Sequence, residues 1–595
     1  MKKESQMRFY KSLLIISFSL IMWGSCKKDL DDSIENISEP ISNLEETPEA
    51  LLGSWNLRQN NSNIDSVVNE CEAENIHFLN NDSFYLQYHD KRVKGTYEIT
   101  SPTKIDLLIE SVLIGTASNT SVDVNKISLE LEIINDCNDF YIGEKYFRIH
   151  QFVWESLNEL YLWQAEVEDL SDNIKPLGSA AYNELISANP EPETFFKSLK
   201  HPDDKHSRIR SNFEDLENSI KGIDASNGVE FILLRSGLGD GVIGVVTHIL
   251  ENSDAFSKNI KRGDIFMGVN GQSLTFNNFN NLLFDDKTSY TLNMAKKINS
   301  GFILNGNDVN LIKEENFQTN PIQVSKVIQR DGKKIAYLMY TQFSQGFDQE
   351  LNSIFSEFKN EGVDELILDL RYNAGGLTQT ALYLSGMITG QFTGQIFSQK
   401  IWNKKVTDYY ESINNTGWMK DLFVSEMDDK TVINSLNLNR VYIITTGNSA
   451  SASEMVINGL SPFIKVIQIG QTTYGKNVGG LAVVYDYIDN TNRTINPDHS
   501  YAISPITFSV ANSEGFSDYA DGLAPSDGFV LSEDVLNMGV LGEYNEPLLA
   551  LALSDISGNS ARKPIFIPKF PIENIISDPD FQKSSLLFMF QEDIP

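Results

Sequence analysis

Between residues 320 and 560, short apolar runs alternate with segments of helical spacing, and this pattern constrains the fold more than any other feature. The expected strands are 336–340, 366–370, 441–445 and 466–469, and the expected helices are 347–358, 377–388 and a segment that includes 455–460. Strands that alternate with helices predict a mainly parallel sheet with helices packed on it. Residues 391–435 interrupt the alternation and are expected to form an insertion with its own structure.

The rest of the chain predicts further domains, as its 595 residues allow. Residues 49–148 alternate with the period of half-buried strands and indicate a small antiparallel β-barrel. Residues 149–220 have helical spacing, and residues 221–300 are again rich in strand-forming sequence. The expected fold class is therefore multidomain α+β, with an α/β core at 320–560 and a tail at 561–595.

The N-terminus has the form of an export signal. Basic residues precede an apolar run at 13–23, which is too short to span a bilayer. The small residues Gly24 and Ser25 then precede Cys26, so that residues 1–25 resemble a bacterial lipoprotein signal and residues 26–48 a polar tether. The resemblance implies a lipid anchor on Cys26 and a place in the bacterial cell envelope, on the outer membrane and facing the periplasm or the cell surface. The alternative is a secretory signal with an incidental cysteine.

The other two cysteines are Cys71 and Cys137. In an oxidising envelope they could pair, and closing a loop of that size would stabilise the fold by about 4 kcal/mol on the chain-entropy model. The alternative is two free buried thiols. We favour the disulfide.

The net charge and the motifs limit which classes of partner and cofactor are expected. Lys plus Arg is 48 and Asp plus Glu is 81, a net charge of −33 that repels phosphate backbones and argues against nucleic acid. The sequence contains neither a His-Glu-x-x-His motif nor a phosphate-binding P-loop, so neither a metal nor a cofactor is expected. His201 and His206 lie close in sequence, but no third group of ligands accompanies them.

The candidate catalytic residues include a serine within residues 446–454. This run of small residues lies between an expected buried strand and a helix. A serine there projects at a helix N-terminus, where free N–H groups favour a developing anion. The downstream candidate base is Lys476, because His499 alone among the seven histidines falls in the α/β region. A lysine base must be neutral, so burial must lower its pKa from ~10.4 to near 7 at a cost of roughly 4–5 kcal/mol.

The sequence Ser-Ala-Ser-Ala-Ser-Glu at 449–454, followed by Gly-Lys at 475–476, resembles the C-terminal processing proteases of serine peptidase family S41. The resemblance covers about residues 150–560 and implies a crotonase-like catalytic core. It implies that Ser451 is the nucleophile and that Lys476, at a spacing that agrees with the family, is the base. It also implies an oxyanion hole formed by the N–H groups of Gly376 and Ala452, with Gly375 as the alternative to Gly376.

Residues 245–271 resemble a bacterial PDZ domain. Such domains add a peptide as a strand and hold its terminal carboxylate with backbone N–H groups. The residues expected to form this peptide-binding segment are Gly228, Val229, Glu230 and Phe231. A PDZ-like fold that serves only as a spacer is the alternative.

One position departs from the family pattern, because Gly480 stands where many members have a glutamine that orients the lysine. Ser449 and Ser453 are expected to be structural, and Glu454 is expected to be a partner of the helix N-terminus rather than a catalytic acid. Arg371 is expected to anchor its loop.

These observations predict an envelope-anchored serine endopeptidase that acts on protein or peptide substrates. The main alternative is a non-catalytic peptide-binding adaptor lipoprotein that uses the PDZ-like domain. A carrier of lipid or another small ligand in residues 49–148 is the third hypothesis. The sequence predicts no oligomeric state.

Overall fold

The computed structural model describes most of the chain from residue 53 to residue 558 and one short strand near its end. The described ranges are 53–59, 73–78, 83–88, 91–101, 104–109, 112–122, 127–133, 139–145, 148–174, 180–189, 191–236, 239–285, 287–299, 301–489, 492–497, 499–558 and 589–591. Cys26, Cys71, Cys137, the expected signal and tether, and the expected tail apart from 589–591 lie outside these ranges. None of the helices in these ranges has both the length and the apolar character that a bilayer span requires.

The chain divides into two compact units. The first comprises Met1–Glu155, Glu168–Leu199 and Tyr485–Tyr501, and the second comprises Ser156–Val167, Lys200–Val484 and Ala502–Pro595.

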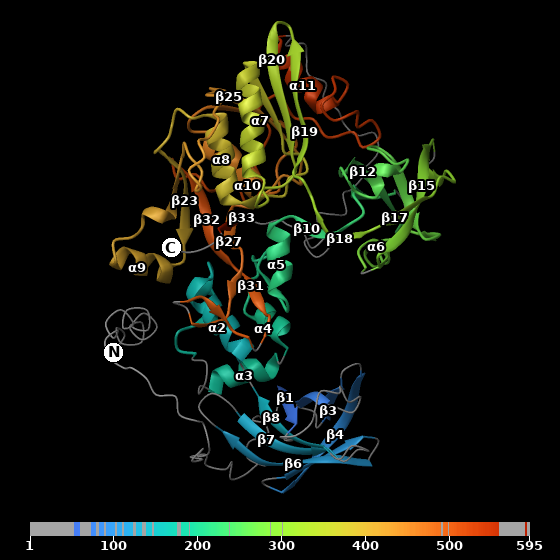
Figure 1. The fold of residues 1–595 in the computed structure, drawn as a ribbon, viewed down its shortest axis with the longest axis vertical. Helices are drawn as coiled ribbons and strands as arrows, with labels where there is room; N and C mark the ends of the chain where they lie inside the picture. The colour runs from blue at the N-terminus through green and yellow to red at the C-terminus, as the bar shows by residue number, and fades with distance from the viewer. Residues whose placement is uncertain are drawn as a thin grey trace, which may run out of the picture. The chain divides into compact units, whose positions relative to one another are not determined.

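The first unit contains a closed barrel of eight strands in sequential order, in which β1 also pairs with β8 (Figure 1). All neighbours are antiparallel, the arrangement expected for residues that alternate in polarity. The strands are β1 (Gly53–Gln59), β2 (Ala73–Phe78), β3 (Ser83–Tyr88), β4 (Lys91–Ser101), β5 (Lys104–Ile109), β6 (Val112–Val122), β7 (Ile127–Ile133) and β8 (Asp139–Lys145).

Mostly helical elements follow the barrel in the chain. They are α2 (Arg148–Leu160), η2 (Gln164–Glu166), η3 (Glu168–Leu170), α3 (Ala180–Ala188), α4 (Pro192–Ser198), the short strand β9 (Arg208–Arg210) and α5 (Phe213–Ile220). Pro192 stands in the first turn of α4, where a missing N–H costs nothing.

The α/β region of the second unit is built on a five-stranded sheet in the order β19-β20-β21-β25-β26. β19 is antiparallel to β20, and the other pairs are parallel, as the alternation of strands and helices predicts. The strands are β19 (Ile322–Arg330), β20 (Lys333–Tyr340), β21 (Glu365–Asp369), β25 (Arg440–Thr445) and β26 (Lys465–Gly470).

Helices cover both faces of this sheet. They are α7 (Asp348–Glu361), α8 (Thr378–Ile388), α10 (Ala452–Leu460) and α11 (Pro547–Ile556). Leu338 of β20 packs with α7, α8 and α10 in one apolar cluster, whereas its neighbour Tyr337 packs with α11 in another. Successive side chains of a strand point to opposite faces, so α11 lies on the face opposite the other three (Figure 1).

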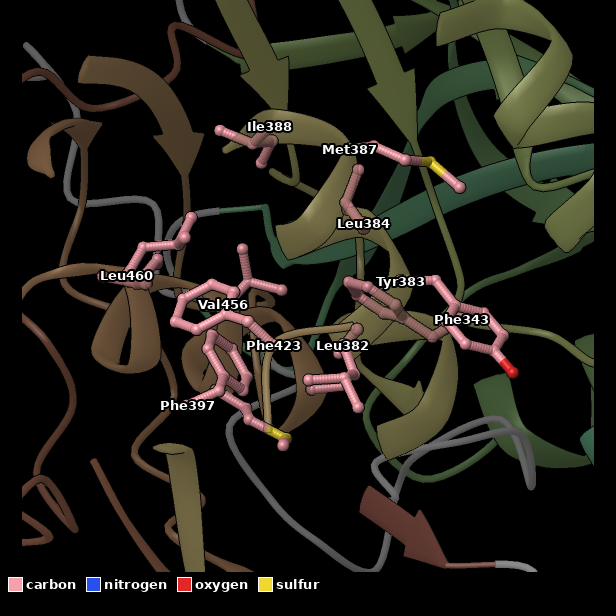
Figure 2. Packing of buried hydrophobic residues seen from close by; sticks show 14 of the residues in the cluster. Phe343, Leu382, Tyr383, Leu384, Met387, Ile388, Phe397, Phe423, Val456 and Leu460 are labelled. Atoms are coloured by element: carbon pink, nitrogen blue, oxygen red, sulfur yellow. The ribbon is translucent and has the colours of Figure 1, made fainter. Parts of the chain in front are cut away.

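A second sheet of six strands, in the order β22-β33-β27-β32-β23-β24, completes the α/β region. Its strands are β22 (Gly376–Leu377), β33 (Met589–Gln591), β27 (Val478–Leu481), β32 (Ile506–Asn512), β23 (Ile396–Trp402) and β24 (Lys420–Leu422). Helices α8 and α10 pack on side chains from both sheets, which explains why every residue of α10 is buried. Figure 2 shows Leu382, Leu384 and Val456 of these helices packed with Phe397 of β23 and with Phe423.

The expectation of a separate insertion at 391–435 is wrong in part. The segment has a helix of its own, α9 (Lys404–Ser412), and the short turn η5 (Gly417–Met419). However, β23 pairs with β32 from Ser398 to Trp402 and so belongs to the core sheet. Apolar residues of this segment, such as Phe397 and Trp402, are buried in the main cluster, which favours this integration.

A further sheet lies in the region that was expected to be rich in strands. It contains β11 (Val229–Arg235), β12 (Val242–Ile249), β13 (Ile265–Val269), β14 (Gln272–Ser273), β15 (Ser289–Ile298), β16 (Gly301–Leu304) and β17 (Val309–Ile312). β11 pairs only with β12 among the described strands, so its other edge is open to a further strand. β17 pairs with β15 and extends this sheet past the expected boundary at residue 300.

The remaining short elements connect these parts. They are β10 (Ile223–Ser226), η4 (Ala255–Ser257), α6 (Phe279–Leu283), β18 (Glu314–Gln318), β28 (Val484–Tyr485), β29 (Tyr487–Asp489), β30 (Thr494–Ile495) and β31 (Ala502–Ser504). β31 pairs with β9 and brings residues 208–210 to the α/β region.

Candidate active site

Ser451, the expected nucleophile, stands at the junction between β25 and α10. Its backbone has φ +63° and ψ −114°, a left-handed conformation that is strained for a residue with a side chain. The residue is wholly buried, and its Oγ has no hydrogen-bond partner among the described residues. The strained turn therefore leaves this hydroxyl available at the N-terminus of a buried helix.

The two neighbouring serines hold this turn in place. Ser449 accepts a hydrogen bond from Thr446 N–H (3.0 Å) and donates one to the Leu370 carbonyl (2.7 Å). Ser453 donates to the carbonyl of Asn373 (2.9 Å). Both hydroxyls tie the turn to residues 370–373 of the facing loop, which is a structural use, although Ser453 does not cap the helix.

Glu454 joins the expected nucleophile and the expected base. One of its oxygens, Oε2, accepts hydrogen bonds from the backbone N–H of Ser451 (2.7 Å) and of Lys476 (2.8 Å). The other oxygen accepts from Gly475 N–H (2.7 Å) and from the hydroxyl of Thr473 (2.6 Å). The backbones of Ser451 and Lys476 therefore meet at a single carboxylate oxygen.

This arrangement gives Glu454 more than the expected role. It is the first-turn partner of the helix N-terminus, as expected, because it accepts from the N–H of Ser451. It also holds the loop that carries the lysine, which residue spacing alone could not indicate. The carboxylate is wholly buried, and burial raises its pKa although the four donors oppose the effect.

Lys476 is buried, with 1% of its surface exposed. Burial holds the pKa of its amine well below the ordinary lysine value, and the positive charge of Arg208 lowers the pKa further. Asp204 and Glu454 act in the opposite direction without cancelling the effect. The position thus favours a neutral amine.

A segment from far earlier in the chain lies beside this lysine. His206 is buried, and its ring lies edge-on to that of Tyr474 with centroids 6.0 Å apart. Burial is the largest cause that lowers its pKa to about 2. Asp204 holds the segment together, since Oδ1 accepts from the N–H groups of His206 and Ser207 (2.8 Å each). The spacing of the two histidines in the sequence suggested only metal ligands and did not indicate that His206 lies beside Lys476.

The described residues contain no group of three or more His, Cys, Asp or Glu side chains able to hold a metal ion. His201, the other histidine of this segment, stacks on Trp163 with ring centroids 5.6 Å apart.

Gly480 shows why a glutamine is absent at its position. It pairs with Ile506 in β32, and a Cβ atom there would lie 2.0 Å from the carbonyl oxygen of Pro505. No side chain fits without a shift of the backbone. The loop that carries Lys476 is held instead through its backbone, because Glu454 accepts from the N–H groups of Gly475 and Lys476.

The glycine loop of the expected oxyanion hole faces the same turn. Gly375 donates its N–H to Asn373 Oδ1 (2.9 Å), and Leu377 donates its N–H to the Phe343 carbonyl (2.9 Å). Since successive backbone groups of a strand point in opposite directions, the N–H of Gly376 points away from Phe343. Gly376 has φ +138°, and a Cβ there would meet the Phe343 carbonyl oxygen at 2.2 Å, so the backbone requires glycine.

Ala452, the second expected donor, is the first residue of α10. An N–H in the first turn has no acceptor within its own helix, and the positive end of the helix dipole lies there. The carbonyl of Asn373 accepts from Ala450 N–H (3.1 Å) and so fixes the glycine loop against the turn.

Arg371 lies behind the glycine loop and is wholly buried. Its guanidinium makes paired hydrogen bonds to Asp369 (2.7 and 2.9 Å) and to Glu546 (2.7 and 2.9 Å), and a further one to Glu533 (2.9 Å). Glu533 also accepts from Arg262 (2.6 Å), which lies in the turn between β12 and β13. Arg371 thus anchors its loop, as expected.

The expected peptide-binding segment lies at the start of β11. The N–H of Gly228 donates to Ser226 Oγ (3.1 Å), and that of Val229 donates to Asn227 Oδ1 (3.0 Å). Glu230 and Phe231 follow in β11, and the Phe231 ring contacts Phe266 and Phe284, with centroids 5.2 and 6.0 Å apart. A carboxylate would have to displace the two side-chain acceptors to use these N–H groups.

Comparison with known proteins gives two family matches. Residues 334–496 match the model of peptidase family S41, and residues 148–210 match that of the peptidase S41 N-terminal domain. A carboxyl-terminal-processing protease of Picosynechococcus sp. is 24% identical over 219 residues, 34% of this chain and 47% of that protein. The carboxy-terminal processing protease CtpA of Bacillus subtilis is 26% identical over 247 residues, 42% of this chain and 47% of that protein.

The matched region therefore spans about half the length of each of these curated relatives. A crystal structure of a Bacteroides fragilis protein assigned to the S41 proteases aligns with 69% of this chain and 98% of its own, with a TM-score of 0.52 and 24% identity. That likeness shows a shared fold. Together, the family matches and the relatives show that residues 148–210 and 334–496 are similar to the serine peptidases of family S41.

Proposed function

We propose that this chain is a serine endopeptidase that cleaves protein or peptide substrates with a dyad of Ser451 and Lys476. The observation that carries the proposal is the shared bond to Glu454, which fixes the backbones of the two residues to one carboxylate oxygen. A strained turn presents the hydroxyl of Ser451, and burial lowers the pKa of the Lys476 amine and so favours its neutral form.

In the first step, Lys476 Nζ takes the proton of Ser451 Oγ while the oxygen attacks the scissile carbonyl. The charged ammonium then returns this proton to the leaving amine as the peptide bond breaks and the acyl-enzyme forms. Water loses a proton to Lys476 as it attacks the ester, and the proton passes to Ser451 Oγ when the product acid leaves.

The negative charge of each tetrahedral intermediate is held by the N–H groups of Gly376 and Ala452. The direction of the Gly376 N–H, away from Phe343, supports this assignment over Gly375, whose N–H is already bonded to Asn373. Preorganised donors of this kind each contribute roughly 3–4 kcal/mol to transition-state stabilisation.

The sheet that begins with β11 would present substrate tails as a PDZ-like domain. Its open edge at β11 is suited to the addition of a peptide strand, and Phe231 would contribute to an apolar wall beside it. The α/β region would then be the crotonase-like core of the enzyme. The lipid anchor at Cys26, the cell-envelope location and the Cys71–Cys137 disulfide belong to the same proposal and have their support in the sequence.

A fluorophosphonate label tests the proposed nucleophile and base directly. The wild type should react, whereas Ser451→Ala and Lys476→Ala should not, because one lacks the oxygen that is modified and the other lacks the base that activates it. Ser461→Ala, an exposed serine just after α10, is the matched control and should react as the wild type does. Equal labelling of all four proteins would refute the dyad, because the label would then be on another residue.

The pH dependence of kcat/KM should reflect the lowered pKa of Lys476. Activity is expected to rise with pH as the amine loses its proton and to level off well below the ordinary lysine value near ~10.4. Protonation of Glu454, whose pKa burial raises, adds to the loss at acid pH, whereas His206 stays neutral and adds nothing. A profile that still rises tenfold per unit up to about pH 10 would contradict a buried lysine base.

A further inference from the structure

The strand β33 occupies a place in the second sheet that its position in the chain does not suggest. It lies between β22 and β27 and is parallel to both. Met589 pairs with Gly376 and Phe590 with Leu377 on one side, while Phe590 pairs with Gly480 on the other. Residues 589–591 therefore bridge two strands that would otherwise face each other across a gap one strand wide.

Those two strands carry the two halves of the proposed site. β22 begins at Gly376, the proposed oxyanion donor, and β27 begins at Val478, shortly after Lys476. The bonds of Phe343 to Gly375 and Leu377 take up the backbone groups on one side of β22. The N–H and C=O of Gly376 must then point toward β33.

This is the geometry that a serine peptidase requires of its substrate. The scissile segment must lie extended, with a carbonyl oxygen directed at the oxyanion donors. An extended chain in the position of β33 satisfies the open edges of both β22 and β27 with main-chain hydrogen bonds, and so needs little specific sequence.

We propose that residues 589–591 bind in the substrate groove of this peptidase as a built-in extended strand and compete there with substrate peptides. The inference rests on the proposed function, since the groove is a substrate groove only if Ser451 and Lys476 cleave peptides. The ligand class of the groove is an extended peptide bound parallel to β22 and β27, and the chain's own segment is its resident occupant.

Tethering makes such competition effective even when the contacts are weak. A segment carried by the same chain as its binding site binds intramolecularly, so its effective concentration does not fall when the protein is dilute. A substrate presented at μM concentrations must displace it, so the resident strand raises the apparent KM and leaves kcat unchanged. A substrate that is itself held at the open edge of β11 overcomes the competition by the same effect.

Peptide binding in the Ser451→Ala background tests the proposal without turnover. The probe is a fluorescent synthetic peptide with the sequence of residues 584–595, followed by fluorescence anisotropy. A chain that ends at residue 588 should bind this probe at least about fivefold more tightly than the full chain. Equal affinities would overturn the proposal.

Substitutions in the full-length chain guard against an effect of truncation on folding. Phe590→Pro removes the N–H that parallel pairing with β22 uses and should give a similar gain in affinity. Phe590→Leu keeps the N–H and should bind the probe as the unaltered Ser451→Ala chain does. An equal gain with leucine and proline would contradict competition through the backbone.

The same proteins separate this inference from the proposed function. With Ser451 restored, fluorophosphonate labelling should be faster in the Phe590→Pro chain than in the wild type. If labelling fails in every variant while the gain in probe affinity remains, the proposed peptidase activity is wrong and the groove is still occupied in cis. If labelling succeeds and the affinities are equal, the built-in strand is wrong.

Discussion

Replacing Lys476 with methionine is expected to lower kcat/KM toward a peptide substrate by about 10⁴-fold or more and, at the same time, to stabilise the protein. On the proposed dyad, the loss follows because Ser451 then has no base to accept its proton. Residues that act as a catalytic unit show losses on the order of 10⁴–10⁶ in kcat. Methionine has a similar length and fills the same buried position without a charge.

The gain in stability follows from the lowered pKa of Lys476. Because the unfolded chain binds a proton more readily at this site, the free energy of unfolding of the wild type rises with pH between the folded pKa and about 10.4. Below that pH window, burial of Lys476 lowers the free energy of unfolding by its full amount. Each unit by which the pKa is lowered corresponds to about 1.4 kcal/mol. The methionine variant avoids this penalty, so its advantage should be greatest at neutral and acid pH and should shrink toward about pH 10.

Thermal unfolding at several pH values, measured beside peptide cleavage, checks both parts. Lys465→Met, at an exposed lysine in β26, is the matched control and should change neither property appreciably. A methionine variant at 476 that retains activity would eliminate the lysine base. A variant that is inactive and also less stable at neutral pH would show that the lysine is not held neutral by burial.

Replacing Arg371 with leucine is expected to be the most destabilising single change behind the active site. The guanidinium is wholly buried and contacts Asp369, Glu533 and Glu546, so its removal leaves buried carboxylates without their partner. Breaking a buried ion pair in this way costs about 3–5 kcal/mol. For a unit of this size, whose unfolding entropy is roughly 2.1 cal/mol/K per residue, that corresponds to a fall in melting temperature of roughly 4–6 °C.

Activity should fall with stability in this variant, because the carbonyl of Arg371 accepts a hydrogen bond from Thr446 and residues 373–376 follow directly. Arg371→Lys keeps the charge but loses the paired hydrogen bonds. Its stability and activity should lie between those of the wild type and those of Arg371→Leu. The control is Lys404→Ala, whose partner Asp408 is exposed and whose loss should change the free energy of unfolding by about 0.5 kcal/mol or less. A change below about 1 kcal/mol for Arg371→Leu would contradict the network, since a broken buried pair costs several times more.

Much of the catalytic core could be predicted from the sequence because the relevant signals are local. The alternation of strands and helices predicted the parallel part of the five-stranded sheet, and the small residues before α10 indicated the turn that carries Ser451. The absence of glutamine at position 480 was also visible. Each of these depends on residues close together in the chain, where period and residue size act directly on the backbone.

The prediction for residues 391–435 was less successful because their structure depends on contacts with distant parts of the chain. Whether an apolar segment such as β23 forms its own structure or joins a sheet depends on the partner strand, and its partner β32 comes much later in the chain. The sequence pattern of β23 is the same in either case.

The sequence by itself determined the strands, the helices and the turn that presents Ser451, because these follow from side-chain period and size within short stretches. Only the tertiary structure decided that Glu454 joins Ser451 to Lys476, that His206 and Asp204 lie beside this lysine, and that β33 lies between β22 and β27. These contacts join residues that are distant in the chain, and they form because burial brings their polar groups to one dry place where each must find a partner.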